Sequence, residues 1–170
     1  MYGRDISKIR ETETKLKESD ELWQFALEGA GDGVWEYNFA TKESFFSRQY
    51  KKMLGYEEDE FQNDFREWIS RIHPDDLHIV RETDHLYHAK KIQSHNREYR
   101  IRHKRGHFIW VLDRGMLVNP KPGVAPTRII GTHTDITERK LHEQTLKSNE
   151  EKYRGIIANM NLGLVESNDE

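Results

Sequence analysis

The sequence contains no cysteine, only four prolines among its 170 residues, and no long apolar run. Without cysteine there is no disulfide, no thiolate metal site, no cysteine nucleophile and no cofactor adduct through a protein thiol. No stretch approaches the ~20 apolar residues that span a bilayer, and the N-terminus lacks the apolar core of a secretory signal. These absences predict a cytoplasmic protein without membrane contact.

Charge of one sign is not in excess either, because 27 Lys and Arg residues stand against 30 Asp and Glu residues. The net charge of −3 gives no overall basic field, so we expect no nucleic-acid partner. Hydrophobic residues make up 35% of the chain, below the roughly 45–50% of average globular proteins. An aromatic content of 11% is nevertheless too high for a wholly disordered chain. We therefore expect a compact core with solvated flanking segments.

The N-terminal third is predicted to be a helix followed by a β-hairpin. Apolar residues at steps of three and four indicate a weak coiled-coil seam at Ile6, Ile9, Leu16 and Trp23. Glycines between residues 29 and 33 then break the helical pattern. Residues 34–39 alternate as a strand does, and a second short strand is expected around residues 45–46.

The middle of the chain is predicted to contain short helices and a second hairpin. Helical pieces are expected between residues 48 and 68, and a longer helix from residues 73–76 to about residue 91. Strands at residues 98–103 and 108–112 are joined by a turn centred on Arg105-Gly106. This turn would pair Tyr99 with Leu112 and Ile101 with Trp110 on a nearly all-apolar face. The other face would carry Ile109 and Val111 beside arginines, and something is expected to cover part of it.

The C-terminal part is predicted to contain a last strand, residues 127–134, followed by a capped helix. Residues 135–138 have the spacing of a capping box that begins with Asp135. A shift of 130 residues superposes residues 5–38 on residues 135–168 without a gap, and nine of the 34 positions are identical. The repeat predicts one full period of a tandem array.

Four motifs resemble those of the PAS family with a C-terminal PAC motif: IHPDD at residues 72–76, EYR at 98–100, the hairpin from Gly106 to Trp110-Val111, and GTHTDITERK at 131–140. The resemblance covers roughly residues 22–140. It implies an α+β PAS fold in which a five-stranded antiparallel sheet carries short helices on one face and is flanked by linker helices. Residues 1–21 would then be a linker helix after a preceding unit, 22–140 the PAS domain, 141–152 an exit linker helix and 153–170 the start of a second PAS domain.

The resemblance implies a sensory or dimerisation module of a multi-PAS signalling protein. Such arrays resemble the input regions of sensor histidine kinases of two-component systems and, less often, of diguanylate cyclases. The expected coupling residues between the last strand and the exit helix are Asp135, Ile136 and Thr137, with Leu146 and Tyr153 on the exit-helix seam. Adjacent PAS and output domains are the implied partners, and a homodimer would form through the flanking helices or the sheet face.

No pattern of catalytic residues is present, so we expect this segment to be non-catalytic. The residues expected around a ligand pocket are Trp35, Tyr37, Tyr99, Ile101, Phe108, Trp110 and Leu112, although the same side chains would also simply fill a core. His78, His85 and His88 are the candidate haem ligands, but helical periodicity places them on the solvent side. We expect no cofactor; a haem or non-covalent flavin sensor and a ligand-free interaction scaffold are the alternatives.

Overall fold

The computed structural model of the chain describes residues 9–15, 17, 22, 26, 29–118 and 127–166, with side chains as far as residue 158 and at residue 160. The chain divides into two compact units, Met1–Asp135 and Ile136–Glu170, which we describe separately. Three of the expected seam residues, Ile6, Leu16 and Trp23, lie outside the described residues. Ile9 belongs to a helical stretch, residues 9–15, and is exposed.

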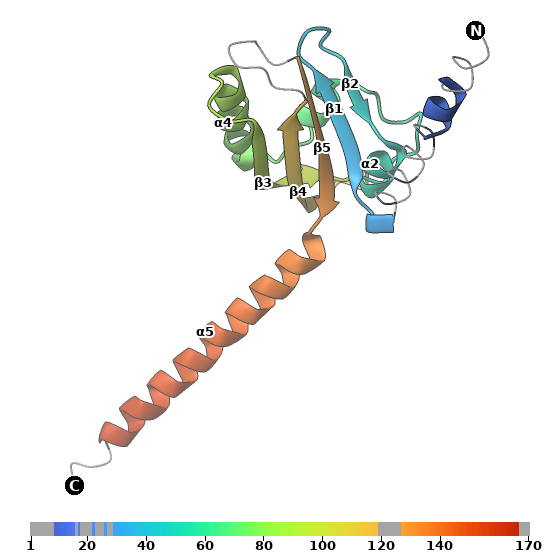
Figure 1. Ribbon diagram of the computed structural model, residues 1–170. Helices are drawn as coiled ribbons and strands as arrows, with labels where there is room; N and C mark the ends of the chain where they lie inside the picture. The colour runs from blue at the N-terminus through green and yellow to red at the C-terminus, as the bar shows by residue number, and fades with distance from the viewer. Residues whose placement is uncertain are drawn as a thin grey trace, which may run out of the picture. The chain divides into compact units, whose positions relative to one another are not determined.

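The first unit is built on one antiparallel sheet of five strands, which confirms the predicted fold class (Figure 1). The strand order across the sheet is β2-β1-β5-β4-β3, so the N-terminal hairpin meets the last strand at the centre. The strands are β1 (Gly33–Asn38), β2 (Ser44–Phe46), β3 (Ser94–Arg102), β4 (Phe108–Leu117) and β5 (Arg128–Asp135). Both β3 and β4 are longer than predicted.

Short helices follow one another between β2 and β3, and polar residues define where they begin. The Ser47 side chain accepts a hydrogen bond from the Tyr50 backbone N–H at the start of α2 (Arg48–Met53). Asp64 does the same for Arg66 at the start of α3 (Phe65–Ile69). The 3₁₀ turn η1 (Pro74–Asp76) leads into α4 (Leu77–His88). Figure 1 shows α2 beside β1 and α4 beside β3.

Helix α4 ends earlier than residue 91 because the backbone of Lys90 adopts the left-handed conformation, with φ of 56°. The Lys91 N–H then donates to the carbonyl oxygen of Leu86 at 2.9 Å, and the Lys90 N–H donates to that of Tyr87 at 3.0 Å. These two bonds form a Schellman motif, which satisfies the last carbonyl groups of a helix.

The hairpin between β3 and β4 has a register one residue away from the predicted one. Tyr99 pairs with Val111 and Ile101 with Ile109, because the connecting loop is Lys104-Arg105-Gly106 and not a two-residue turn. The Gly106 N–H donates to the His103 carbonyl oxygen at 2.9 Å, and Gly106 has φ of 92°. This is the three-residue hairpin loop in which a left-handed glycine closes the turn.

The register change moves side chains to the other face of the sheet. The prediction that Phe108, Trp110 and Leu112 share a face with Tyr99 and Ile101 is therefore wrong. The prediction that Ile109 and Val111 lie on the mixed outer face is also wrong: both are buried in the domain's own core. A partner is not needed to cover them.

The second unit consists of one helix, α5 (Thr137–Glu166), which continues through residue 153 without a break. Its apolar side chains that the structure describes are exposed: Leu141, Leu146, Tyr153, Ile156, Ile157 and Met160. Among the described residues, none of the helices combines the length and the apolar character that a membrane span requires.

Candidate functional site

Two glycines in the middle of the sheet leave room for two large rings. One row of paired residues runs His95, Gly115, Gly131, Trp35 across β3, β4, β5 and β1. A Cβ atom on Gly115 would overlap with the His95 ring, and one on Gly131 would overlap with the Trp35 indole. The His95 and Trp35 rings thus occupy the space above the two glycines and stack on each other, with centroids 5.9 Å apart and 13° between their planes.

A buried carboxylate occupies the neighbouring row, where Asp113 pairs with Arg97 on β3 and with His133 on β5. Asp113 is fully buried. Its Oδ2 accepts from Arg97 Nε at 2.8 Å, and its Oδ1 accepts from Trp35 Nε1 at 3.0 Å. The Nε2 atoms of His95 and His133 each lie 3.3 Å from Oδ1. We call Asp113, Arg97, His95 and His133 the polar cluster.

The partners of Asp113 decide its charge. Burial alone would raise its pKa, because desolvation penalises the charged form. The neighbouring His133, His95 and Arg97 outweigh burial and hold the pKa of Asp113 well below its usual range. The carboxylate is therefore ionised at neutral pH and provides a fixed negative charge inside the domain.

Two tyrosines extend the polar cluster. Tyr99 Oη lies 2.9 Å from His133 Nε2 and accepts from Trp68 Nε1 at 3.0 Å. Tyr87 Oη lies 2.8 Å from His95 Nδ1. His95 Nε2 has its contact with Asp113 Oδ1, whereas His133 Nδ1 is buried and has no hydrogen-bond partner in the part of the chain that the structure describes. The His133 imidazole therefore keeps one nitrogen that its neighbours do not satisfy.

A cavity of about 270 Å³ lies against the polar cluster. Half of the sixteen residues in its wall are aromatic or aliphatic: Trp35, Tyr37, Phe39, Phe46, Phe65, Trp68, Tyr87 and Ile129. The polar residues of the wall are Glu36, Lys42, Ser44, Asp84, His88, His95, Arg97 and His133. Burial raises the pKa of Asp84, the carboxyl group that α4 contributes. Such a cavity suits a small, mostly apolar molecule with a few polar groups.

The structure brings together only two of the residues predicted for a ligand pocket, Trp35 and Tyr37. Tyr99 and Ile101 are buried in the core and do not line the cavity. Phe108, Trp110 and Leu112 belong to the opposite sheet face, as the corrected register requires.

The polar cluster was not predicted from the sequence: none of its four residues was expected to belong to a site. The available signal was alternation: His95 and Arg97 precede Tyr99 and Ile101 at inward positions of β3, and Asp113 follows Ile109 and Val111 on β4. A charged residue at an inward position of a strand is rarely buried without a partner.

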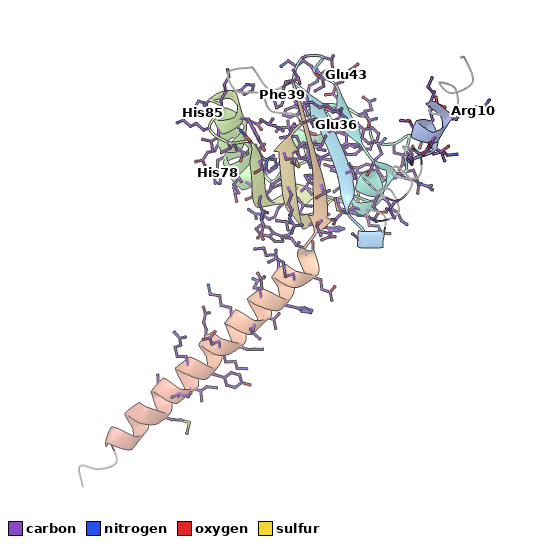
Figure 2. The ribbon with its side chains drawn as sticks, viewed as in Figure 1. Arg10, Glu36, Phe39, Glu43, His78 and His85 are labelled. Carbon is purple, nitrogen blue, oxygen red and sulfur yellow. The ribbon has the colours of Figure 1, made fainter. Side chains whose placement is uncertain are left out.

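The histidines of α4 were the candidate haem ligands. Figure 2 labels His78 and His85 on this helix, and both are exposed, as predicted. His88 is also exposed but contributes to the cavity wall and packs against Phe39, with ring centroids 5.9 Å apart. Within the residues that the structure describes, no three acidic or histidine side chains are placed to hold a metal ion.

The expected coupling residues lie where the two units meet along the chain. Asp135 is the last residue of β5, and Thr137 is the first residue of α5. The Lys140 N–H donates to the Ile136 carbonyl oxygen at 2.9 Å. A capping role for Asp135 stays a prediction. His133, two residues before Asp135 on the same strand, belongs to the polar cluster.

Comparison with known proteins places this architecture in a family. The family model of the PAS fold matches residues 43–133, more than half of the chain. A solved structure of a sensory box histidine kinase/response regulator from Burkholderia thailandensis is 32% identical, with a TM-score of 0.67. The similarity covers 78% of this chain and 97% of that chain.

Two curated relatives are much longer than this chain. A blue-light-activated histidine kinase of Brucella anthropi is 29% identical over 141 residues, which are 82% of this chain and 27% of the relative. A two-component sensor of Pseudomonas aeruginosa is 26% identical over 114 residues, which are 66% of this chain and 12% of the relative. The chain thus spans about a quarter or less of the length of the curated relatives it matches.

Proposed function

The chain belongs to the PAS family, and we propose that it is a sensory module that passes the state of its cavity through β5 into α5. The observation that carries the proposal is the position of His133. This residue lines the cavity and lies 3.3 Å from the Asp113 carboxylate. Its strand ends two residues later, and one residue separates the strand from α5. A ligand that displaces His133 therefore acts on the strand from which the helix continues.

Asp135, Ile136 and Thr137 are proposed to couple strand and helix, with Asp135 capping the helix. We propose that residues 22–140 form the PAS domain, that residues 1–21 and 141–152 are linker helices, and that residues 153–170 begin a second PAS unit. The names of the 32% and 29% identical relatives favour a histidine kinase as the downstream output domain. This segment would itself contribute no catalytic step, and we propose a cytoplasmic location for it.

Helix α5 is proposed to pair with a second copy of itself. Leu146, Tyr153 and Met160 follow one another at intervals of seven residues and are exposed. A seven-residue spacing of apolar side chains favours a two-stranded coiled coil. A paired helix would transmit a change in angle or rotation to the next domain.

Asp135→Ala in the full-length protein tests the coupling. We expect the basal autophosphorylation rate of the output kinase to change several-fold, because coupling free energies between sites are typically about 1–3 kcal/mol. Asp59→Ala, which removes an exposed acid in the loop after α2, is the control. If Asp135→Ala leaves both the output rate and its regulation unchanged, the coupling role is wrong.

We propose that the cavity holds neither haem nor flavin, the two cofactors that remained as alternatives. Its volume of about 270 Å³ is below the roughly 300–1,000 Å³ of pockets that hold drug-sized ligands. A flavin nucleotide, with three fused rings, a ribityl chain and a phosphate, or a haem needs a larger space. We expect purified protein to show no flavin or Soret absorption. A strong Soret band that a histidine substitution removes would contradict this expectation.

A further inference from the structure

The charged residues around the cavity differ in whether they already have a hydrogen-bond or ion-pair partner within the protein. Arg97 Nε donates to Asp113, and its NH1 donates to the Val80 carbonyl oxygen at 3.3 Å. Glu36 accepts from Arg128 at 2.8 Å. These two charged residues are paired within the protein, so a ligand gains little by contacting them.

Asp84 is different. It contributes to the cavity wall from α4 and has neither a hydrogen bond nor an ion pair with any described residue. Burial has the largest effect on the pKa of Asp84 and raises it. Arg97, His88 and His95 favour the ionised form, Asp113 disfavours it, and the pKa of Asp84 is raised overall. A carboxylate only accepts hydrogen bonds, so this group lacks a donor.

The rest of the wall suits an aromatic ring. Tyr37 and Phe65 have centroids 5.1 Å apart, Phe65 and Trp68 also 5.1 Å, and Tyr37 and Phe39 5.2 Å. Aromatic faces attract both other rings and cations. The part of the cavity wall that combines these rings with the unpaired Asp84 carboxylate therefore favours a ligand with an apolar ring and a donor group.

We propose that the cavity binds a small aromatic amine, with its ring among Tyr37, Phe65 and Trp68 and its amino group donating to Asp84. The inference rests on the proposed sensory function and names the chemical class of its ligand. An aromatic acid of the same size would bring a second negative charge next to Asp84 in a poorly solvated site, which is unfavourable. The carboxylate thus selects the amine against the acid.

Isothermal titration calorimetry on the purified chain tests the selection with three probes: phenethylamine, 3-phenylpropionate and ethylbenzene. We expect phenethylamine to bind at least about tenfold more tightly than either of the others, the size expected of one charge-assisted hydrogen bond. Asp84→Asn should remove this preference. Glu82→Gln, the same change at an exposed position of α4, is the matched control and should keep it.

Three results would overturn the inference: equal or tighter binding of 3-phenylpropionate, a preference for the amine that survives in Asp84→Asn, or no binding of phenethylamine at millimolar concentration to folded protein. Native mass spectrometry of the same preparations separates this failure from that of the proposed function. A retained ligand without an amino group would overturn the amine selection and leave the sensory function standing. The Asp135→Ala experiment tests that function independently.

Discussion

The loss of Asp113 should lower the stability of the domain strongly. Its substitution would leave Arg97 with its charge buried and unpaired, and both imidazoles without their common acceptor. We expect Asp113→Ala to lower the free energy of unfolding by about 3–5 kcal/mol, as is typical when one partner of a buried ion pair is removed. Urea denaturation measures this, with Asp59→Ala as the exposed control. A loss no larger than that of the control would contradict the structure.

The pH dependence of that stabilisation follows from the lowered pKa of Asp113. A lowered pKa in the folded state stabilises the protein above the unfolded pKa of about 3.9, and the contribution is lost as the pH falls through the lower, folded pKa. The stability difference between wild type and Asp113→Asn should therefore not decline between neutral pH and about pH 5 and should shrink only in strong acid. Urea midpoints measured at several pH values check this. A difference that declines already between pH 7 and pH 5 would be inconsistent with it.

Asp84 should have the opposite effect on stability, because burial raises its pKa. Because the pKa of Asp84 is lower in the unfolded state than in the folded state, the unfolded state loses this proton first as the pH rises. The free energy of unfolding therefore falls as the pH rises between the two pKa values, and it stays lowered at neutral pH. Asp84→Asn should therefore raise the urea midpoint at pH 7 and have little effect below pH 3.8. Residues that serve binding commonly reduce stability in this way. A lower midpoint at pH 7 would show that Asp84 has a stabilising contact.

At the scale of elements, the exposed apolar row of α5 leads us to predict that the chain self-associates. If Leu146, Tyr153 and Met160 form a seam, Leu146→Glu should move the chain from dimer to monomer by placing a charge in the interface. Ser148→Glu adds the same charge at an exposed position outside that seven-residue row and should leave the dimer intact. Sedimentation equilibrium distinguishes the two species. An unchanged dimer in Leu146→Glu would place the interface elsewhere.

The β3-β4 hairpin illustrates what sequence can and cannot predict about an element. Alternation located both strands, and Gly106 located the turn. Neither signal specified whether two or three residues close the loop, because a glycine at position 106 is suitable for both types of turn. The predicted pairing would have set Glu98 opposite Asp113. The site was missed for this reason: the Arg97–Asp113 pair exists only in the observed register.

At the scale of the whole molecule, all residues of the two core clusters come from the sequence between Trp35 and Ile129, and no side chain that the structure describes in α5 belongs to either cluster. A chain that ends after Lys140 should therefore unfold in urea at the midpoint of the full chain. It should also lose concentration-dependent association, because the proposed seam is absent. A clearly lower midpoint would show that residues beyond 140 stabilise the domain.

The order of elements could be predicted because turn residues and alternation are local properties of the chain, whereas the five-stranded sheet was expected only from the resemblance of four motifs to the PAS family. A pocket was among the expectations, but its volume and most of its lining could not be predicted, because the volume is what remains after Trp35, Phe65, Trp68 and the other large rings have packed. A change of one rotamer would fill or widen it, and sequence spacing does not determine rotamers.

The three-residue loop at Lys104-Arg105-Gly106 also bears on how this domain can evolve. An insertion or deletion of one residue there requires a different turn, or else the strand pairing slips by one position. A slip would turn Arg97 and Asp113 to opposite faces of the sheet and dismantle the polar cluster without altering any of its residues. The length of this loop and the buried Arg97–Asp113 pair should therefore be kept together in evolution. We expect natural variants to carry substitutions in the loop but not insertions or deletions.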